Sequence, residues 1–235
     1  MIAVQFIAVI VIGYLLGSIP FGIIISRLTS NLDITRYGSG NTGGTNVMRI
    51  LGLGPGALVM LLDLGKAFAA VVIARLIFTG SAALYIGFPP VGEPLQSAAE
   101  CSAAMAAMLG HNWSAYIKFR GGKGVSAYFG SWLVLFPMIA LIGGVVAVIT
   151  VAISKTMSRA SILGSIAAMC ALIILTIWYG LQPEYLIYSV LATGIIIYQH
   201  RTNIARLQNG TESKLDETII KGQASQKSNN GQVNK

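Results

Sequence analysis

Residues 37–49 form a polar loop whose composition suits the binding of an anion. Glycines let successive backbone N–H groups converge on an anion without side-chain clashes, and the loop adds hydroxyl, amide and guanidinium donors. The residues predicted to surround the anion are Gly38, Ser39, Gly40, Asn41, Thr45, Asn46 and Arg49. Small residues also serve close helix packing in membranes, but packing does not account for so many donors in one segment.

A second segment, residues 118–124, contains Lys118, Arg120, Gly121, Gly122, Lys123 and Gly124. Backbone amides of the glycines and the ammonium of Lys123 can meet one anion at the start of a helix, where the helix dipole also favours negative charge. The spacing is not that of the Gly-x-x-x-x-Gly-Lys-Ser/Thr loop of nucleotide-binding proteins. We interpret the first two cations as groups that reach toward lipid headgroups, and Lys123, Gly121 and Gly122 as anion ligands.

A third segment follows the last apolar stretch, at residues 200–206. His200 and Asn203 are three residues apart, so on a continuing helix they share one face, with Arg206 three residues further along. A single histidine is usually structural, but its pairing with an amide at a helix end makes a functional role equally acceptable. Both interpretations of His200 stay open at this point.

Two charged residues, Asp63 and Lys66, lie inside an apolar stretch, three residues apart. Such charges are unfavourable in lipid unless they are paired or face the interior of a bundle, and structural pairing is the favoured interpretation. Cys101 and Cys170 belong to different apolar stretches, which favours packing roles over metal binding. The sequence has no metal-ligand cluster and no Ser-His-Asp arrangement, so any chemistry must rely on positioning, charge and proton handling.

The elements that position these segments are apolar helices. Hydrophobic residues make up 54% of the 235 residues and charged residues only 10%, and the mean hydropathy is +0.72, which is typical of a polytopic membrane protein. About 20 mostly apolar residues are needed to cross a bilayer. The predicted fold is therefore all-α with seven transmembrane helices, at residues 2–26, 53–78, 96–117, 124–136, 138–154, 160–179 and 184–200. A turn at Phe136-Pro137 separates the two short segments in the middle.

The distribution of charge predicts the orientation. With seven spans, all three segments described above share one side, together with most of the lysines and arginines. By the positive-inside rule that side is cytoplasmic, so the N-terminus is outside and the C-terminus inside. The net charge of +8 is thus explained by orientation and an anionic ligand, and no nucleic-acid partner is expected. Residues 1–208 form the predicted membrane domain, and the polar residues 209–235 form a predicted disordered cytoplasmic tail.

Four ordered motifs carry a family resemblance. Gly17-Ser-Ile-Pro-Phe-Gly22, the two parts Gly38-Ser-Gly-Asn41 and Thr45-Asn-Val-Met-Arg49, Gly121-Gly-Lys-Gly124 and His200-Arg-Thr-Asn-Ile204 resemble the membrane-integral, acylphosphate-dependent glycerol-3-phosphate acyltransferases of bacteria, the PlsY family. By motif match the catalytic positions of that family fall on Ser39, Arg49, Lys123, His200 and Asn203, and Ser161 matches a further substrate-binding position.

The resemblance implies transfer of an acyl group from acyl phosphate to the 1-hydroxyl of glycerol 3-phosphate, giving lysophosphatidic acid and phosphate. It implies no cofactor, membrane lipids as surroundings, a place in the bacterial inner membrane, and a soluble enzyme that produces acyl phosphate as a partner. His200 or a substrate phosphate oxygen then takes the proton. A transporter of organic phosphate is the alternative, but its site is expected near the bilayer midplane, whereas these cations cluster at one face. A lipid-binding scaffold without chemistry is the third reading.

Overall fold

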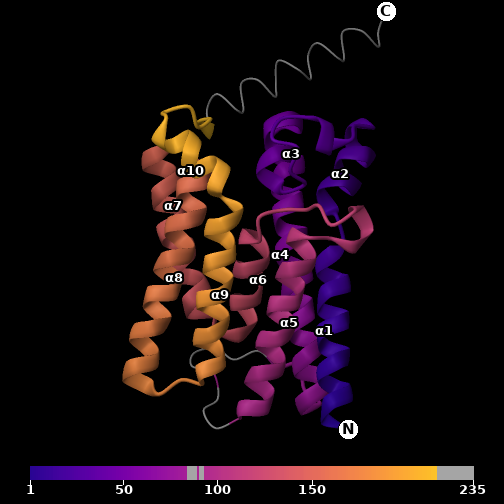
Figure 1. Ribbon diagram of the computed structural model, residues 1–235, viewed down its shortest axis with the longest axis vertical. Helices are drawn as coiled ribbons and strands as arrows, with labels where there is room; N and C mark the ends of the chain where they lie inside the picture. Colours follow the sequence, from indigo (N-terminus) through magenta and orange to yellow (C-terminus); the bar gives the residue numbers. More distant parts are fainter. Residues whose placement is uncertain (84–88, 90–92, 216–235) are drawn as a thin grey trace, which may run out of the picture.

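The computed structural model describes residues 1–83, 89 and 93–215, and within these residues the regular structure is helical (Figure 1). The α-helices are α1 Ile2–Ser18, α2 Phe21–Ser30, α3 Gly44–Leu51, α4 Leu53–Thr79, α5 Pro94–Asn112, α6 Val125–Leu135, α7 Pro137–Ser154, α8 Met157–Tyr179, α9 Pro183–Gln199 and α10 Arg201–Gln208. Two short 3₁₀ turns are η1 Ile34–Arg36 and η2 Ala115–Ile117. The predicted fold class, all-α, is confirmed.

Helices occupy all seven predicted stretches, and four of those described are long and apolar enough to cross a membrane: Ile2–Ser30, Leu53–Thr79, Pro137–Ser154 and Met157–Tyr179. The expected turn is present, because α6 ends at Leu135, Phe136 is extended and α7 begins with proline. However, α6 has only 11 residues. At 1.5 Å per residue it is about 16 Å long, roughly half of a bilayer core.

The apolar stretch Ile2–Ser30, which covers the first predicted span, is broken into the two helices α1 and α2. Pro20 has no N–H to continue the hydrogen-bond ladder of α1, and the chain turns through Ile19 and Pro20 before α2 begins. The carbonyl of Ile19 accepts a hydrogen bond from Lys66 Nζ of α4, at 2.8 Å. A cation from a neighbouring helix thus satisfies a backbone group at the break.

The helices pack closely because small residues lie where they cross. A Cβ on Gly17 of α1 would come within 2.1 Å of the carbonyl oxygen of Ala107 on α5, so only glycine allows this approach. The largest buried side chains include Trp132 and Tyr128 of α6, which meet Tyr188 of α9 at ring-centroid distances of 5.4 and 6.2 Å. This aromatic core joins α6, which follows the loop of Lys123, to α9, which ends next to His200.

The chain ends and the short helices show how the site is assembled. In Figure 1 the N-terminus lies at the lower end, whereas α2, α3 and α10 lie at the upper end. One turn before the end of α4, Arg75 is buried and paired with Glu100 of α5 through two contacts of 2.8 and 2.9 Å. The upper end therefore gathers the three polar segments, which are distant in sequence.

Candidate active site

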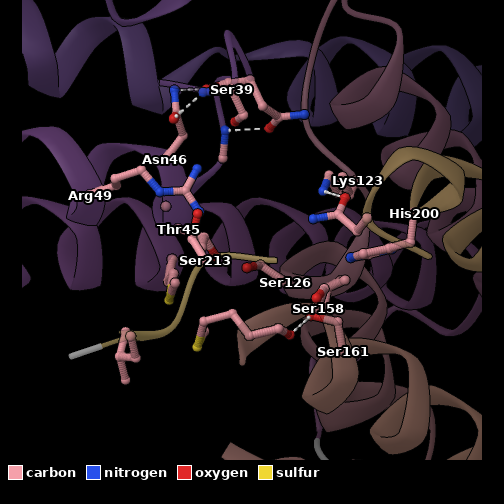
Figure 2. Close-up of a pocket in the computed structure, with 18 of the residues that line it drawn as sticks. Ser39, Thr45, Asn46, Arg49, Lys123, Ser126, Ser158, Ser161, His200 and Ser213 are labelled. Carbon is pink, nitrogen blue, oxygen red and sulfur yellow. Dashed lines mark hydrogen bonds between the residues drawn. The ribbon is translucent and has the colours of Figure 1, made fainter. Parts of the chain in front are cut away.

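A polar cavity of about 140 Å³ opens among α3, the loop before α6, the start of α8 and α10 (Figure 2). Nine of the predicted site residues line it: Ser39, Asn41, Thr45, Asn46, Arg49, Lys123, Ser161, His200 and Asn203. Four predicted glycines, Gly38, Gly40, Gly121 and Gly122, lie beside these residues in sequence and shape the backbone. The structure thus brings all three segments to one cavity.

Asn46 shapes the first loop. Its amide nitrogen donates to the carbonyls of Tyr37 and Asn41, at 3.1 and 2.9 Å, and its amide oxygen accepts from the backbone N–H of Ser39, at 2.9 Å. Gly38 has a positive φ of 59°, and a Cβ there would lie 2.4 Å from the Asn46 oxygen. Because these groups are already paired, the structure gives Asn46 a role in the shape of the loop, and Ser39 and Thr45 are left to face the cavity.

Arg49 lies one helical turn after Thr45 on α3, so both side chains reach the same cavity. Its Nε is buried and has no hydrogen-bond partner among the residues that the structure describes. Burial lowers the pKa of the guanidinium, opposed by Glu212 and assisted by Arg206, although arginine stays charged in proteins. A buried, unpaired, charged donor is unfavourable by itself, which favours an anion as its partner.

The second loop lies against the end of α5. The N–H of Gly122 donates to the carbonyl of His111 at 2.8 Å, and a Cβ on Gly122 would lie 1.9 Å from His111 Nε2. Lys123 then projects into the cavity, where its ammonium donates to Asn203 Oδ1. Burial lowers the pKa of Lys123 to about 8, with Arg206 and Arg49 acting in the same direction and Glu212 against it.

The third segment differs slightly from the expected continuous helix. The chain is interrupted at His200, between the last residue of α9 and the first of α10. His200 Nδ1 lies 2.8 Å from the carbonyl of Ile196, which can only accept, so Nδ1 carries the proton and Nε2 is the free nitrogen. Burial and the neighbouring Lys123 ammonium lower the pKa of His200 to about 4, so the ring is neutral at pH 7.

Sequence reasoning missed Glu212, which it placed in the tail. The carboxylate accepts hydrogen bonds from Ser158 Oγ at 2.9 Å, Asn203 Nδ2 at 2.7 Å and Arg206 Nε at 2.7 Å. Burial opposes its ionisation, but these three hydrogen bonds hold its pKa below the usual value. A single acidic residue in a polar segment without periodicity gives no signal of such a role. The rest of the predicted tail, residues 216–235, lies outside the described residues.

A buried cluster of charged and titratable residues, Asp63, Lys66 and His111, lies at one wall of the cavity. Asp63 Oδ1 lies 2.7 Å from Lys66 Nζ, which confirms the predicted pairing, and 3.4 Å from His111 Nδ1. Asp63 and His111 also line the cavity. The cluster therefore connects the break after α1, through Lys66, to the glycine loop that carries Lys123.

Comparisons with known proteins agree with this geometry. The family model described as glycerol-3-phosphate acyltransferase matches residues 7–210. Glycerol-3-phosphate acyltransferase 3 of Dehalococcoides mccartyi is 42% identical over 217 residues, covering 92% of this chain and 99% of its own. The glycerol-3-phosphate acyltransferase of Shouchella clausii is 38% identical over 212 residues, covering 90% and 97%.

Two solved structures are similar in fold as well as in sequence. The crystal structure of PlsY, an integral membrane glycerol 3-phosphate acyltransferase, in its glycerol 3-phosphate form has a TM-score of 0.76 and 32% identity, covering 89% of this chain and 94% of its own. The lysophosphatidic acid form has a TM-score of 0.75 and 32% identity, covering 92% and 98%. This chain belongs to the glycerol-3-phosphate acyltransferase family, in its integral membrane PlsY branch.

Proposed function

We propose that this protein transfers an acyl group from acyl phosphate to the 1-hydroxyl of glycerol 3-phosphate, giving lysophosphatidic acid and phosphate. The observation that carries the proposal is the meeting of Arg49 and Lys123 in one small polar cavity at the end of an apolar bundle. Two phosphate-bearing substrates need cations there, and the acyl chain needs an apolar surrounding. The similar PlsY structures are described as glycerol 3-phosphate and lysophosphatidic acid forms, which fits the same acceptor and product.

In this proposal some side chains neutralise the charge of the substrate phosphates, and others position the substrates. Arg206 is paired with Glu212, so Arg49 and Lys123 are the cavity cations left to neutralise substrate phosphates. Ser39, Thr45 and the first backbone N–H groups of α3 add donors around the same anion. Fixed donors of this kind hold the acceptor hydroxyl near the acyl carbon and stabilise the negative charge that develops on the carbonyl oxygen.

In the proposed reaction the acceptor oxygen attacks the carbonyl carbon of acyl phosphate, and the bond from that carbon to the phosphate oxygen breaks. Phosphate leaves with the electron pair, and the hydroxyl proton passes to a phosphate oxygen. No acyl-enzyme is required because the donor is already activated. Ser158 and Ser161, at the start of α8, line the cavity, and we assign them to the donor or the leaving phosphate. To donate to that phosphate, their hydroxyls turn away from Glu212 and from the carbonyl of Met157, which accept from them in this structure.

We assign His200 to binding and not to proton abstraction. A general base works best with a pKa near the operating pH, and a pKa of about 4 makes His200 a weak base. A phosphate monoester has a second pKa of about 6 and is the better acceptor. The free Nε2 of neutral His200 can accept a hydrogen bond from a substrate hydroxyl, while Asn203 holds Lys123 in place.

We further propose seven membrane spans in the bacterial inner membrane, with the N-terminus outside and the cavity and C-terminus facing the cytoplasm. The concentration of cations around the cavity supports this orientation. Because Glu212 contributes to the cavity, the acyltransferase domain is proposed to extend past residue 208. Labelling of single cysteines in a background without Cys101 and Cys170 tests the orientation. A cysteine at Thr42 that reacts with an impermeant reagent outside intact cells refutes it.

Delivery of acyl phosphate by a soluble enzyme on the cytoplasmic side follows from the same proposal, since the donor is reactive and amphipathic. The reaction is tested with purified protein and both substrates, by following lysophosphatidic acid and phosphate together. Arg49→Ala and Lys123→Ala are each expected to lower kcat/KM at least about tenfold, because a charge-assisted contact contributes roughly 1.5–3 kcal/mol. Arg27→Ala, on an exposed face of α2, is the matched control and keeps normal kinetics.

A further inference from the structure

The loop between α5 and α6 presents two aromatic rings outside the helical bundle. Tyr116 is 55% exposed and Phe119 is 65% exposed, and two exposed cations, Lys118 and Arg120, lie next to them in the chain. In Figure 1 this loop crosses α1 and projects sideways from the bundle, below the level of α2 and α3. Alternating exposed rings and cations are not explained by packing within this chain.

The loop has a defined structure. Ser114 and Arg120 form an antiparallel bridge with an N–H to carbonyl distance of 3.1 Å, and the N–H of Phe119 donates to the carbonyl of Ser114 at 2.9 Å. The hydroxyl of Ser114 donates to the carbonyl of Ser18, the last residue of α1, at 2.5 Å. The loop is therefore fixed at the level where the first apolar helix ends.

Two residues of the loop also have an unfavourable backbone conformation. Lys118 and Phe119 both have a φ of 56°, in the left-handed region that non-glycine residues avoid. Burial of the Phe119 ring offsets little of the free-energy cost of this conformation, because most of the ring surface is exposed. The backbone therefore holds the Phe119 side chain outward, although the ring gains little burial within the chain.

We propose that residues 114–120 form an interfacial anchor that binds the headgroup region of a membrane leaflet rich in anionic phospholipid. Aromatic side chains favour the boundary between headgroups and acyl chains, and nearby lysine and arginine attract anionic lipids. A soluble acidic protein offers the same charge, but the loop lies beside a lipid-facing helix, where membrane is the adjacent phase.

The anchor is continuous with the catalytic loop. Arg120 is followed directly by Gly121, Gly122 and Lys123, and the N–H of Gly122 is held by His111. Lipid contact at Phe119 therefore fixes one end of the segment that places the Lys123 ammonium in the cavity. Anionic lipid is expected to tighten the binding of phosphate substrates as a secondary effect.

The test is independent of acyl transfer. Phe119→Cys, in the full chain with Cys101→Ala and Cys170→Ala, is labelled with bimane and placed in nanodiscs that contain nitroxide-labelled lipid. The anchor predicts strong quenching by lipid labelled near the headgroup, weaker quenching by lipid labelled at the chain end, and stronger quenching with phosphatidylglycerol than with phosphatidylcholine alone. Ser30→Cys, exposed at the last residue of α2, is the matched control and is quenched much less.

A double variant tests whether Lys118 and Arg120 cause the preference for anionic lipid. Lys118→Gln with Arg120→Gln is expected to remove the extra quenching caused by phosphatidylglycerol while leaving the quenching in phosphatidylcholine. If Phe119→Cys does not fold, Tyr116→Cys reports the same surface. A water-like bimane spectrum without quenching at both positions, or quenching only when an acidic soluble protein is added, overturns the proposal. Either result is distinguishable from a failure of acyl transfer, since no substrate is present.

Discussion

Replacement of Gly122 by alanine tests how the structure places Lys123. The new Cβ would lie 1.9 Å from Nε2 and 2.5 Å from Cε1 of His111, well inside van der Waals contact. His111 has little freedom to move, because it is 7% exposed and its Nδ1 lies 3.4 Å from Asp63. The glycine loop must therefore shift, and the adjacent Lys123 must shift with it.

The expected losses of stability and of kcat/KM in Gly122→Ala follow from two effects. Overpacking of this kind is unfavourable by about 1–3 kcal/mol, which lowers the thermal midpoint. Loss of a charge-assisted phosphate contact at Lys123 contributes roughly 1.5–3 kcal/mol, so kcat/KM for glycerol 3-phosphate falls about 10- to 150-fold.

The assay is initial-rate kinetics in detergent or nanodiscs, with a thermal unfolding curve for each variant. Gly65→Ala is the matched control, because no heavy atom lies within 4 Å of a Cβ at that position in α4. It is expected to keep normal kinetics. If Gly122→Ala shows kinetics and stability indistinguishable from wild type, the placement of the loop against His111 is wrong.

Three further predictions follow from the described contacts. Because the Lys123 pKa is lowered to about 8, its positive charge is present below that pH and lost above it, so kcat/KM should fall above about pH 8; Lys123→Arg, which stays charged, should remove that alkaline limb from the pH profile. His200→Gln should mainly raise KM for glycerol 3-phosphate, whereas a fall in kcat alone would show that His200 is the base. Asp63→Asn leaves Lys66 buried without its counter-charge and should destabilise the protein by about 3–5 kcal/mol in thermal or denaturant unfolding; Asp63→Asn with Lys66→Met should recover part of that loss, and equal stability of Asp63→Asn and wild type contradicts the pairing.

Hydrophobic stretches and local motifs made much of the fold predictable. Apolar length located the long helices of the bundle, and glycine with adjacent donors located the two segments that reach the cavity. The second half of the first segment was predicted as loop but is helical, because α3 begins at Gly44 and packs on α4. The pairing of Asp63 with Lys66 followed from their spacing, since helix residues three apart share a face.

What could not be predicted depends on contacts between distant segments. Glu212 acts through Ser158 and Asn203, which are 54 and 9 residues away, and no periodicity links those positions. The contact of Gly122 with His111 explains why glycine is needed there, but only the packed structure brings the two together. By contrast, the short α6 was predictable, because Pro137 ends the apolar stretch 124–136 at the point where Phe136 leaves the helix.

The central claim is direct acyl transfer from acyl phosphate in this cavity, and donor competition tests it most directly. Purified protein is given glycerol 3-phosphate with acyl phosphate, acyl-CoA or both, and lysophosphatidic acid and released phosphate are measured over time. We expect equimolar lysophosphatidic acid and phosphate from acyl phosphate, strong preference over acyl-CoA, and loss of both products in Arg49→Ala and Lys123→Ala. Comparable turnover with acyl-CoA, or product formation that does not depend on these two cations, contradicts the account.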